Sequence, residues 1–110
     1  MSTDIKQKSF SEIINGDTPV LVDFYADWCG PCKMMNPILK ELKKSVGNSI
    51  HILKIDTDKN PAAAINYNVR GIPTLILFKK GKILWQQSGV VQLNQLNSII
   101  NQKLAQAKEL

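Results

Sequence analysis

Cys29 and Cys32 are the only cysteines of the chain, and two residues separate them. A disulfide that closes so short a loop stabilises a fold very little, which argues against a structural staple. Zinc prefers four ligands, but the chain has no third cysteine and one histidine, His51, inside a strand pattern. The spacing therefore predicts a dithiol that forms and breaks a disulfide as its chemistry.

The cysteine pair lies where a strand pattern changes to a helical pattern. Residues 20–26 are mostly β-branched or aromatic and predict a strand buried on both faces. Apolar residues at helical spacing predict a helix over residues 31–46, with Pro31 at its start and Pro37 in its interior. The free N–H groups and dipole of a helix N-terminus favour thiolate over thiol. A cysteine at this turn is therefore primed for nucleophilic attack.

Size and composition limit the remaining possibilities. With 110 residues and 44% hydrophobic residues, the chain is expected to fold as one domain. The net charge of +5 comes from lysines that are spread along the chain, without a nucleic-acid-binding module, so nucleic acid is not an expected partner. The N-terminus has no apolar signal-peptide core, and no apolar run reaches transmembrane length. We therefore expect no membrane association and a reducing cytoplasm as the compartment.

The order of the predicted elements indicates an α/β fold. Residues 1–8 are polar and form either a short edge strand or a tail, and residues 9–110 form the domain. Ser9 and Glu12 match a capping box that opens a short helix. Further strands are predicted at residues 50–55, 74–78 and 83–87, and further helices from Pro61, with Asn60 as N-cap, and from Leu93. This order predicts a central mixed sheet of four to five strands with helices on both faces.

Two motifs resemble the thioredoxin family. Trp-Cys-Gly-Pro-Cys-Lys at residues 28–33 follows Val-Asp-Phe at residues 22–24, and Gly-Ile-Pro-Thr stands at residues 71–74. The resemblance extends without gaps from about Pro19 to Gly89, and the order of the elements agrees as far as the C-terminus. It implies the thioredoxin fold and a thiol-disulfide oxidoreductase that reduces protein disulfides.

The resemblance implies different roles for the two cysteines. Cys29 is the expected nucleophile, which attacks a protein disulfide to form a mixed disulfide. Cys32 is the expected resolving thiol, which then attacks Cys29 and releases the reduced substrate. The predicted positions agree with this order, because Cys29 is expected at the exposed helix start and Cys32 one turn inside, where it is shielded.

Two charged residues in strand patterns are further candidate catalytic groups. Asp23 stands in an apolar strand, where burial is expected to raise its pKa. The resemblance implies that Asp23 accepts the proton of Cys32, through water, and that Lys54 is the partner of Asp23. The alternative is a buried ion pair with a purely structural role.

The resemblance also implies a substrate-binding rim around Cys29. Pro73 matches the cis-proline of the family, and a cis bond would expose the backbone of Ile72 for pairing with an extended substrate segment. The expected rim consists of Trp28, Gly30, Pro31, Gly71, Ile72, Pro73 and Gly89. Tyr25 departs from the family, which most often has Trp at this position.

The expected partners are disulfide-containing proteins and a flavin-dependent thioredoxin reductase that uses NADPH. The chain has no dinucleotide-binding fingerprint, so we expect no cofactor of its own, and a monomer. Two alternatives remain open, a disulfide oxidase or isomerase and a redox-independent accessory subunit that holds a partner. The Gly30-Pro31 pair between the cysteines favours the reducing function, by resemblance.

Overall fold

The computed structural model describes residues 9–108, which form a single four-stranded sheet and the helices packed on it. The expectation of an edge strand or tail at residues 1–8 lies outside the described residues. The elements, in chain order, are α2 (Phe10–Ile14), β1 (Val20–Tyr25), α3 (Gly30–Val46), the 3-10 helix η1 (Gly47–Ser49), β2 (His51–Asp56), α4 (Pro61–Asn66), β3 (Thr74–Lys79), β4 (Lys82–Ser88) and α5 (Leu93–Lys108).

The strand order across the sheet is β2-β1-β3-β4. β1 runs parallel to β2 and antiparallel to β3, and β3 and β4 form the predicted antiparallel hairpin. This confirms the expected mixed sheet, with four strands among residues 9–108. In the register of β1 and β2, Asp23 lies beside Lys54, so the two charged candidates are lateral neighbours.

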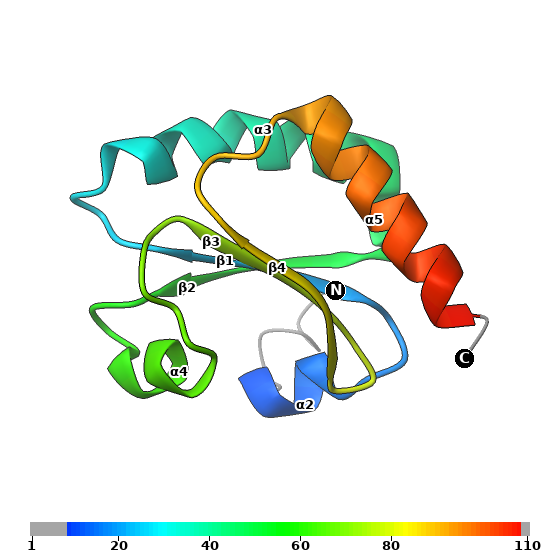
Figure 1. Cartoon of the computed structure of the whole chain (residues 1–110), viewed down its shortest axis with the longest axis horizontal. Coiled ribbons are helices and arrows are strands. Elements are labelled where there is room, and N and C mark those ends of the chain that lie inside the picture. Colours follow the sequence, from blue (N-terminus) through cyan, green and yellow to red (C-terminus); the bar gives the residue numbers. More distant parts are fainter. Residues whose placement is uncertain (1–8, 109–110) are drawn as a thin grey trace.

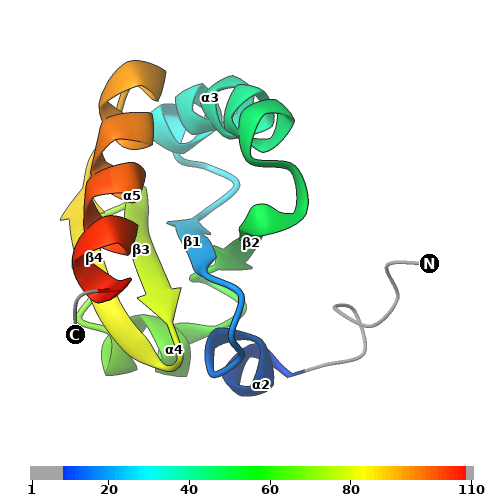
Figure 2. The same ribbon diagram turned by 90° about the vertical axis from the view of Figure 1, so that its right-hand side faces the viewer.

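Helices cover both faces of the sheet, as predicted. α3 and α5 lie on one face, and α2 and α4 lie on the other (Figure 1). The view turned by 90° shows the same two layers on either side of the strands (Figure 2). The α3 side is mainly aliphatic, with Leu21 and Met35 fully buried in it. The opposite side contains an aromatic cluster in which the rings of Phe10 and Phe78 both pack edge-on against Tyr67.

The ends of the helices mostly follow the sequence signals. Ser9 and Glu12 form both hydrogen bonds of the capping box of α2, and Gly47 ends α3 with a φ of 54°. Asn60 is the N-cap of α4, as predicted, but its side chain makes no capping hydrogen bond. Its Nδ2 instead donates to the carbonyl of Asp56, at 3.0 Å. This contact ties the start of α4 to the end of β2.

Among residues 9–108, no helix is both long enough and apolar enough to cross a membrane.

Candidate active site

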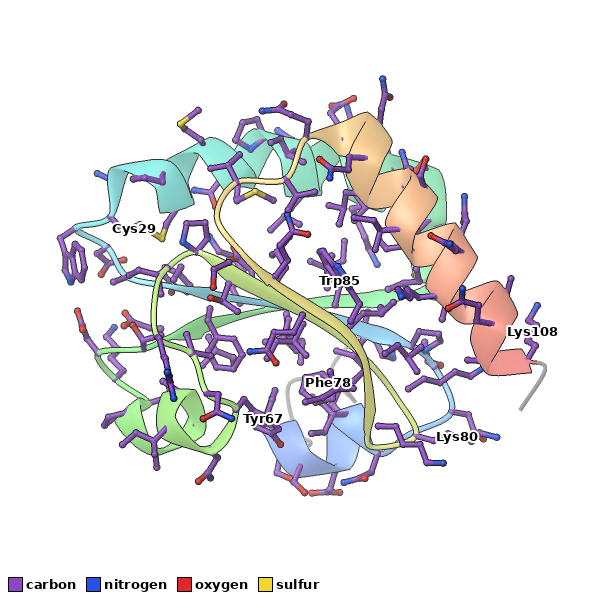
Figure 3. All side chains as sticks on the ribbon, viewed as in Figure 1. Cys29, Tyr67, Phe78, Lys80, Trp85 and Lys108 are labelled. Carbon is purple, nitrogen blue, oxygen red and sulfur yellow. A yellow bond between two sulfur atoms is a disulfide. The ribbon has the colours of Figure 1, made fainter. Side chains whose placement is uncertain are left out.

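Cys29 occupies the N-cap of α3, directly after the loop that leaves β1. The backbone N–H of Cys32 donates to Sγ of Cys29 at 3.1 Å, so the Cys29 sulfur takes the place of a capping oxygen. Cys29 and Cys32 form a disulfide, with their Cα atoms 5.3 Å apart. In Figure 3 Cys29 lies at the start of α3, at the opposite end of the molecule from Lys80 and Lys108. The helix N-terminus therefore faces a sulfur that can carry negative charge.

The expected difference in exposure between the two cysteines is wrong. Cys29 is 4% exposed and Cys32 is 3% exposed. Both are buried because they are bonded to each other and because Ala26, Tyr25 and Ile72 pack around the pair. The two sulfurs differ instead in the cavities that they border.

A mostly apolar groove of about 550 Å³ borders Cys29. Five of the seven predicted rim residues line it, namely Trp28, Gly30, Pro31, Gly71 and Ile72. Pro73 is buried and Gly89 is exposed, and neither lines the groove. The N–H of Gly89 donates to the carbonyl of Pro73 at 2.8 Å, so Gly89 holds the chain that follows Ile72.

Four lining residues were missed by the sequence reasoning, namely Thr57, Ala64, Val69 and Arg70. Thr57 directly follows β2, and the other three lie within or after α4. Because β1 and β2 are parallel, the segments that follow them meet at the same edge of the sheet as the cysteine turn. The parallel pairing of the two strands could therefore have indicated, from the sequence, that residues after β2 line the groove opposite the cysteine turn.

Trp28 is 71% exposed, although tryptophan is normally largely buried. Its indole Nε1 donates to Oδ2 of Asp58 at 2.9 Å. This hydrogen bond fixes the ring at the edge of the groove while leaving most of it accessible. Asp58 was not identified from the sequence.

The peptide bond between Ile72 and Pro73 is cis, as expected. The carbonyl oxygen of Ile72 lies 3.7 Å from Sγ of Cys29, so this backbone faces the disulfide. The hydroxyl of Thr74 donates to the carbonyl of Gly71 at 2.5 Å and also bonds to Ser88. Thr74 thereby fixes the loop that carries Ile72.

Asp23 is completely buried in β1, and neither carboxylate oxygen has a hydrogen-bond partner among residues 9–108. Burial raises the pKa of Asp23 to about 6, and the positive charge of Lys54 opposes part of this rise. A carboxyl group with this pKa changes its protonation state just below neutral pH, which suits proton exchange.

Lys54 does not form an ion pair with Asp23 in the described part of the chain. Its Nζ donates instead to Oδ1 of Asn36 at 2.6 Å and lies 4.5 Å from the centre of the Tyr25 ring. The structural ion pair considered above therefore has no support in this geometry. Tyr25, which departs from the family pattern, contributes a cation–π contact to this arrangement.

A second, smaller cavity of about 130 Å³ borders Cys32. It is lined by Tyr25, Ala26, Asp27, Cys32, Lys33, Asn36 and Lys54. Asn36 was missed by the sequence reasoning, although it follows Cys32 by about one helical turn and so lies on the same helix face.

Comparison with known proteins places this arrangement in a family. The family model named Thioredoxin matches residues 2–102. The chain belongs to the thioredoxin family. It is therefore a thiol-disulfide oxidoreductase, with the Cys29–Cys32 disulfide as its redox-active pair.

Individual thioredoxins agree with this assignment. A thioredoxin of Rickettsia bellii is 43% identical over 101 residues, which cover 91% of this chain and 93% of that protein. Thioredoxin Y2, chloroplastic, of Arabidopsis thaliana is 46% identical over 97 residues, which cover 87% of this chain and 58% of that protein. The structure of a mutant thioredoxin from Halobacterium salinarum superposes with a TM-score of 0.78 at 37% identity, covering 88% of this chain and 84% of the other. The thioredoxin fold predicted from the sequence is confirmed.

Proposed function

We propose that the protein reduces disulfides in other proteins, with Cys29 as nucleophile and Cys32 as resolving thiol. The observation that carries this proposal is the position of Cys29, which caps α3 and also borders the open apolar groove. A thiolate there is favoured by the helix N-terminus and lies beside a surface that can hold a protein segment. Cys32 borders the small cavity instead, out of reach of a bulky substrate.

The proposed reaction has two exchange steps. The Cys29 thiolate attacks one sulfur of the substrate disulfide, the substrate S–S bond breaks, and the first substrate sulfur leaves as a thiolate. Cys32 then loses its proton and attacks Sγ of Cys29, which breaks the mixed disulfide and releases the second substrate thiolate. The substrate gains two electrons, its two thiolates take up one proton released by Cys32 and one from solvent, and the Cys29–Cys32 disulfide is left. Both thiols belong to one helix turn, so the second step benefits from a high effective concentration.

Asp23 is the proposed acceptor of the Cys32 proton, and Lys54 is its proposed electrostatic partner. Burial without hydrogen-bond partners among residues 9–108 and a pKa of about 6 support the role of Asp23. The lateral pairing of Asp23 with Lys54 supports the second assignment. Transfer would run through water, as the sequence resemblance implies.

Substrate binding is proposed at the groove and at the backbone of Ile72. Trp28, Gly30, Pro31, Gly71 and Ile72 would contact an extended substrate segment, and Pro73 and Gly89 would hold the backbone of Ile72 in place. The contact of the Ile72 carbonyl with Cys29 supports this position, because a segment paired there would bring its disulfide beside the nucleophile.

The oxidised protein needs an electron donor, for which we propose a thioredoxin reductase that uses FAD and NADPH. The protein would thus act as an electron carrier, as a monomer in the cytoplasm, with residues 9–110 as its catalytic domain. The reductive direction is supported by the Gly-Pro pair between the cysteines, which the family resemblance associates with reduction.

Insulin provides a direct test of this function. The protein with NADPH and thioredoxin reductase should reduce insulin disulfides, measured as NADPH consumption, and the Cys29→Ser/Cys32→Ser variant should be inactive. A protein that oxidises dithiols but does not reduce insulin would contradict the proposal in favour of an oxidase. Full biological activity of the double variant would instead indicate an accessory subunit.

A further inference from the structure

Lys54 lies on the exposed side of β2, where a long and flexible lysine side chain would normally extend into water. In this protein Lys54 is exposed, yet two groups on different elements hold its ammonium. Oδ1 of Asn36 in α3 accepts a hydrogen bond from it at 2.6 Å, and the centre of the Tyr25 ring in β1 lies 4.5 Å from it. The ammonium is thereby kept at the wall of the cavity that borders Cys32.

We propose that Asn36 is a positioning residue that holds the Lys54 ammonium at the wall of the cavity that borders Cys32, so that its charge acts on Asp23 in the neighbouring strand. The catalytic consequence of this positioning rests on the proposed function, in which Asp23 accepts the proton of Cys32. The Asn36 side chain bonds to Lys54 and makes no hydrogen bond to either sulfur among residues 9–108, so its effect passes through Lys54.

The surroundings determine where Lys54 moves when Asn36 is removed. Asn36 and Lys54 also line a neighbouring cavity of about 420 Å³, whose other charged groups are Lys40 and Lys43. Both are cations and repel a third ammonium. Asp23 is fully enclosed, and burial of an ammonium against it carries a large desolvation cost. A released Lys54 ammonium therefore moves outward into water, away from Asp23.

Few other charges act on Asp23. On the side of β2 it faces Lys54, and on the side of β3 it faces Leu75. The cavity beside Cys32 adds Asp27 from the loop and Lys33 and Cys32 from α3, of which Cys32 is in the disulfide. Lys54 is the charge that lowers the pKa of Asp23 against the effect of burial. By fixing the position of the Lys54 ammonium, Asn36 therefore influences the pKa of Asp23.

The test is a titration of the Asp23 carboxyl in the full-length oxidised protein by carbon-13 NMR. Asn36→Ala should raise the pKa of Asp23 by about 0.5 to 1 unit, since the opposing positive charge moves away. Lys54→Gln should raise it at least as much. In the Lys54→Gln background, Asn36→Ala should have no further effect.

A matched control and a second measurement make the test specific. Asn101→Ala makes the same change on an exposed position of α5 and should leave the titration unchanged. The side-chain protons of Lys54 near the Tyr25 ring should show a ring-current shift that Asn36→Ala abolishes and Asn101→Ala preserves. An unchanged or lowered pKa in Asn36→Ala, or an equal shift with and without Lys54, would overturn the proposal. Neither measurement uses catalysis, so the proposal can fail independently of the disulfide-reductase function.

Discussion

The two cysteines of the active site are equally buried but have different surroundings. Cys29 borders a groove of about 550 Å³ with mostly apolar walls, in which Arg70 is the charged residue. Cys32 borders a cavity of about 130 Å³ whose walls include Asp27, Lys33 and Lys54. One sulfur thus faces a surface suited to a protein segment, and the other faces a small polar space.

The two different cavities suit the two cysteine thiols, which are chemically identical, to different functions. In the proposed mechanism a protein segment would bind in the groove and would be too large for the small cavity, so the groove would select Cys29 as the sulfur that attacks. The small cavity has room for water and is lined by Lys54, whose neighbour in the adjacent strand is Asp23 with its raised pKa. This arrangement suits proton transfer. The comparison predicts that changes on the Cys32 side alter pH dependence, whereas changes on the Cys29 side alter substrate binding.

The largest effect is expected from Asp23→Asn, because the substitution removes the proposed general base for Cys32. The breakdown of the mixed disulfide near pH 7 should slow by a factor of about 100, a typical contribution of general acid–base catalysis. Stopped-flow measurement of mixed-disulfide decay across pH tests this. The same change at the exposed Asp17 should have no effect. An unchanged rate and pH profile in Asp23→Asn would exclude the proton-acceptor role.

The same substitution should stabilise the protein in a pH-dependent way. The pKa of Asp23 is 3.8 in model compounds and about 6 in the fold, so the folded state binds the proton more tightly. This tighter proton binding adds to the free energy of unfolding. The added stability is fully present below pH 4 and is lost as the pH rises through 6. At pH 7, Asp23→Asn should increase the free energy of unfolding by up to about 3 kcal/mol, and at pH 3.5 by much less. Urea unfolding of the oxidised protein at both pH values measures this, and an equal change at both would contradict it.

A smaller effect, on the Cys29 side, is expected from Trp28→Ala. The ring is 71% exposed beside the groove, so its loss should lower kcat/KM for insulin by about tenfold through weaker binding, a typical value for an interface tryptophan. The free energy of unfolding and the pH profile should stay unchanged. Ile65→Ala is a control, because Ile65 is 75% exposed but does not line the groove. A shifted pH profile with unchanged kcat/KM would break the proposed division between the two sides.

The predictable part of the site was local in sequence. The strand-to-helix turn with Cys29 at the helix start followed from hydrophobic patterns, and the cis bond before Pro73 followed from a family motif. The missed partners, Asn36 of Lys54 and Asp58 of Trp28, are separated from them by 18 and 30 residues. Such contacts depend on how side chains meet after the sheet has formed, and spacing along the chain does not encode them.

The wrong expectation about exposure has a related cause. The position of Cys29 at a helix start suggested an open sulfur, but Ile72, which is 43 residues away, packs over it. The two sulfurs therefore differ in which cavity each borders, a property of the folded surface that the sequence pattern does not show.

Trapping of the mixed disulfide distinguishes a Cys29 that attacks from a Cys32 that resolves. Reduced Cys32→Ser and Cys29→Ser variants are mixed with a disulfide-bonded substrate protein, and the covalent adducts are mapped by mass spectrometry. Cys32→Ser should accumulate a stable adduct on Cys29, and Cys29→Ser should form none on the same timescale. An adduct that forms through Cys32 at a comparable rate would contradict this assignment of roles.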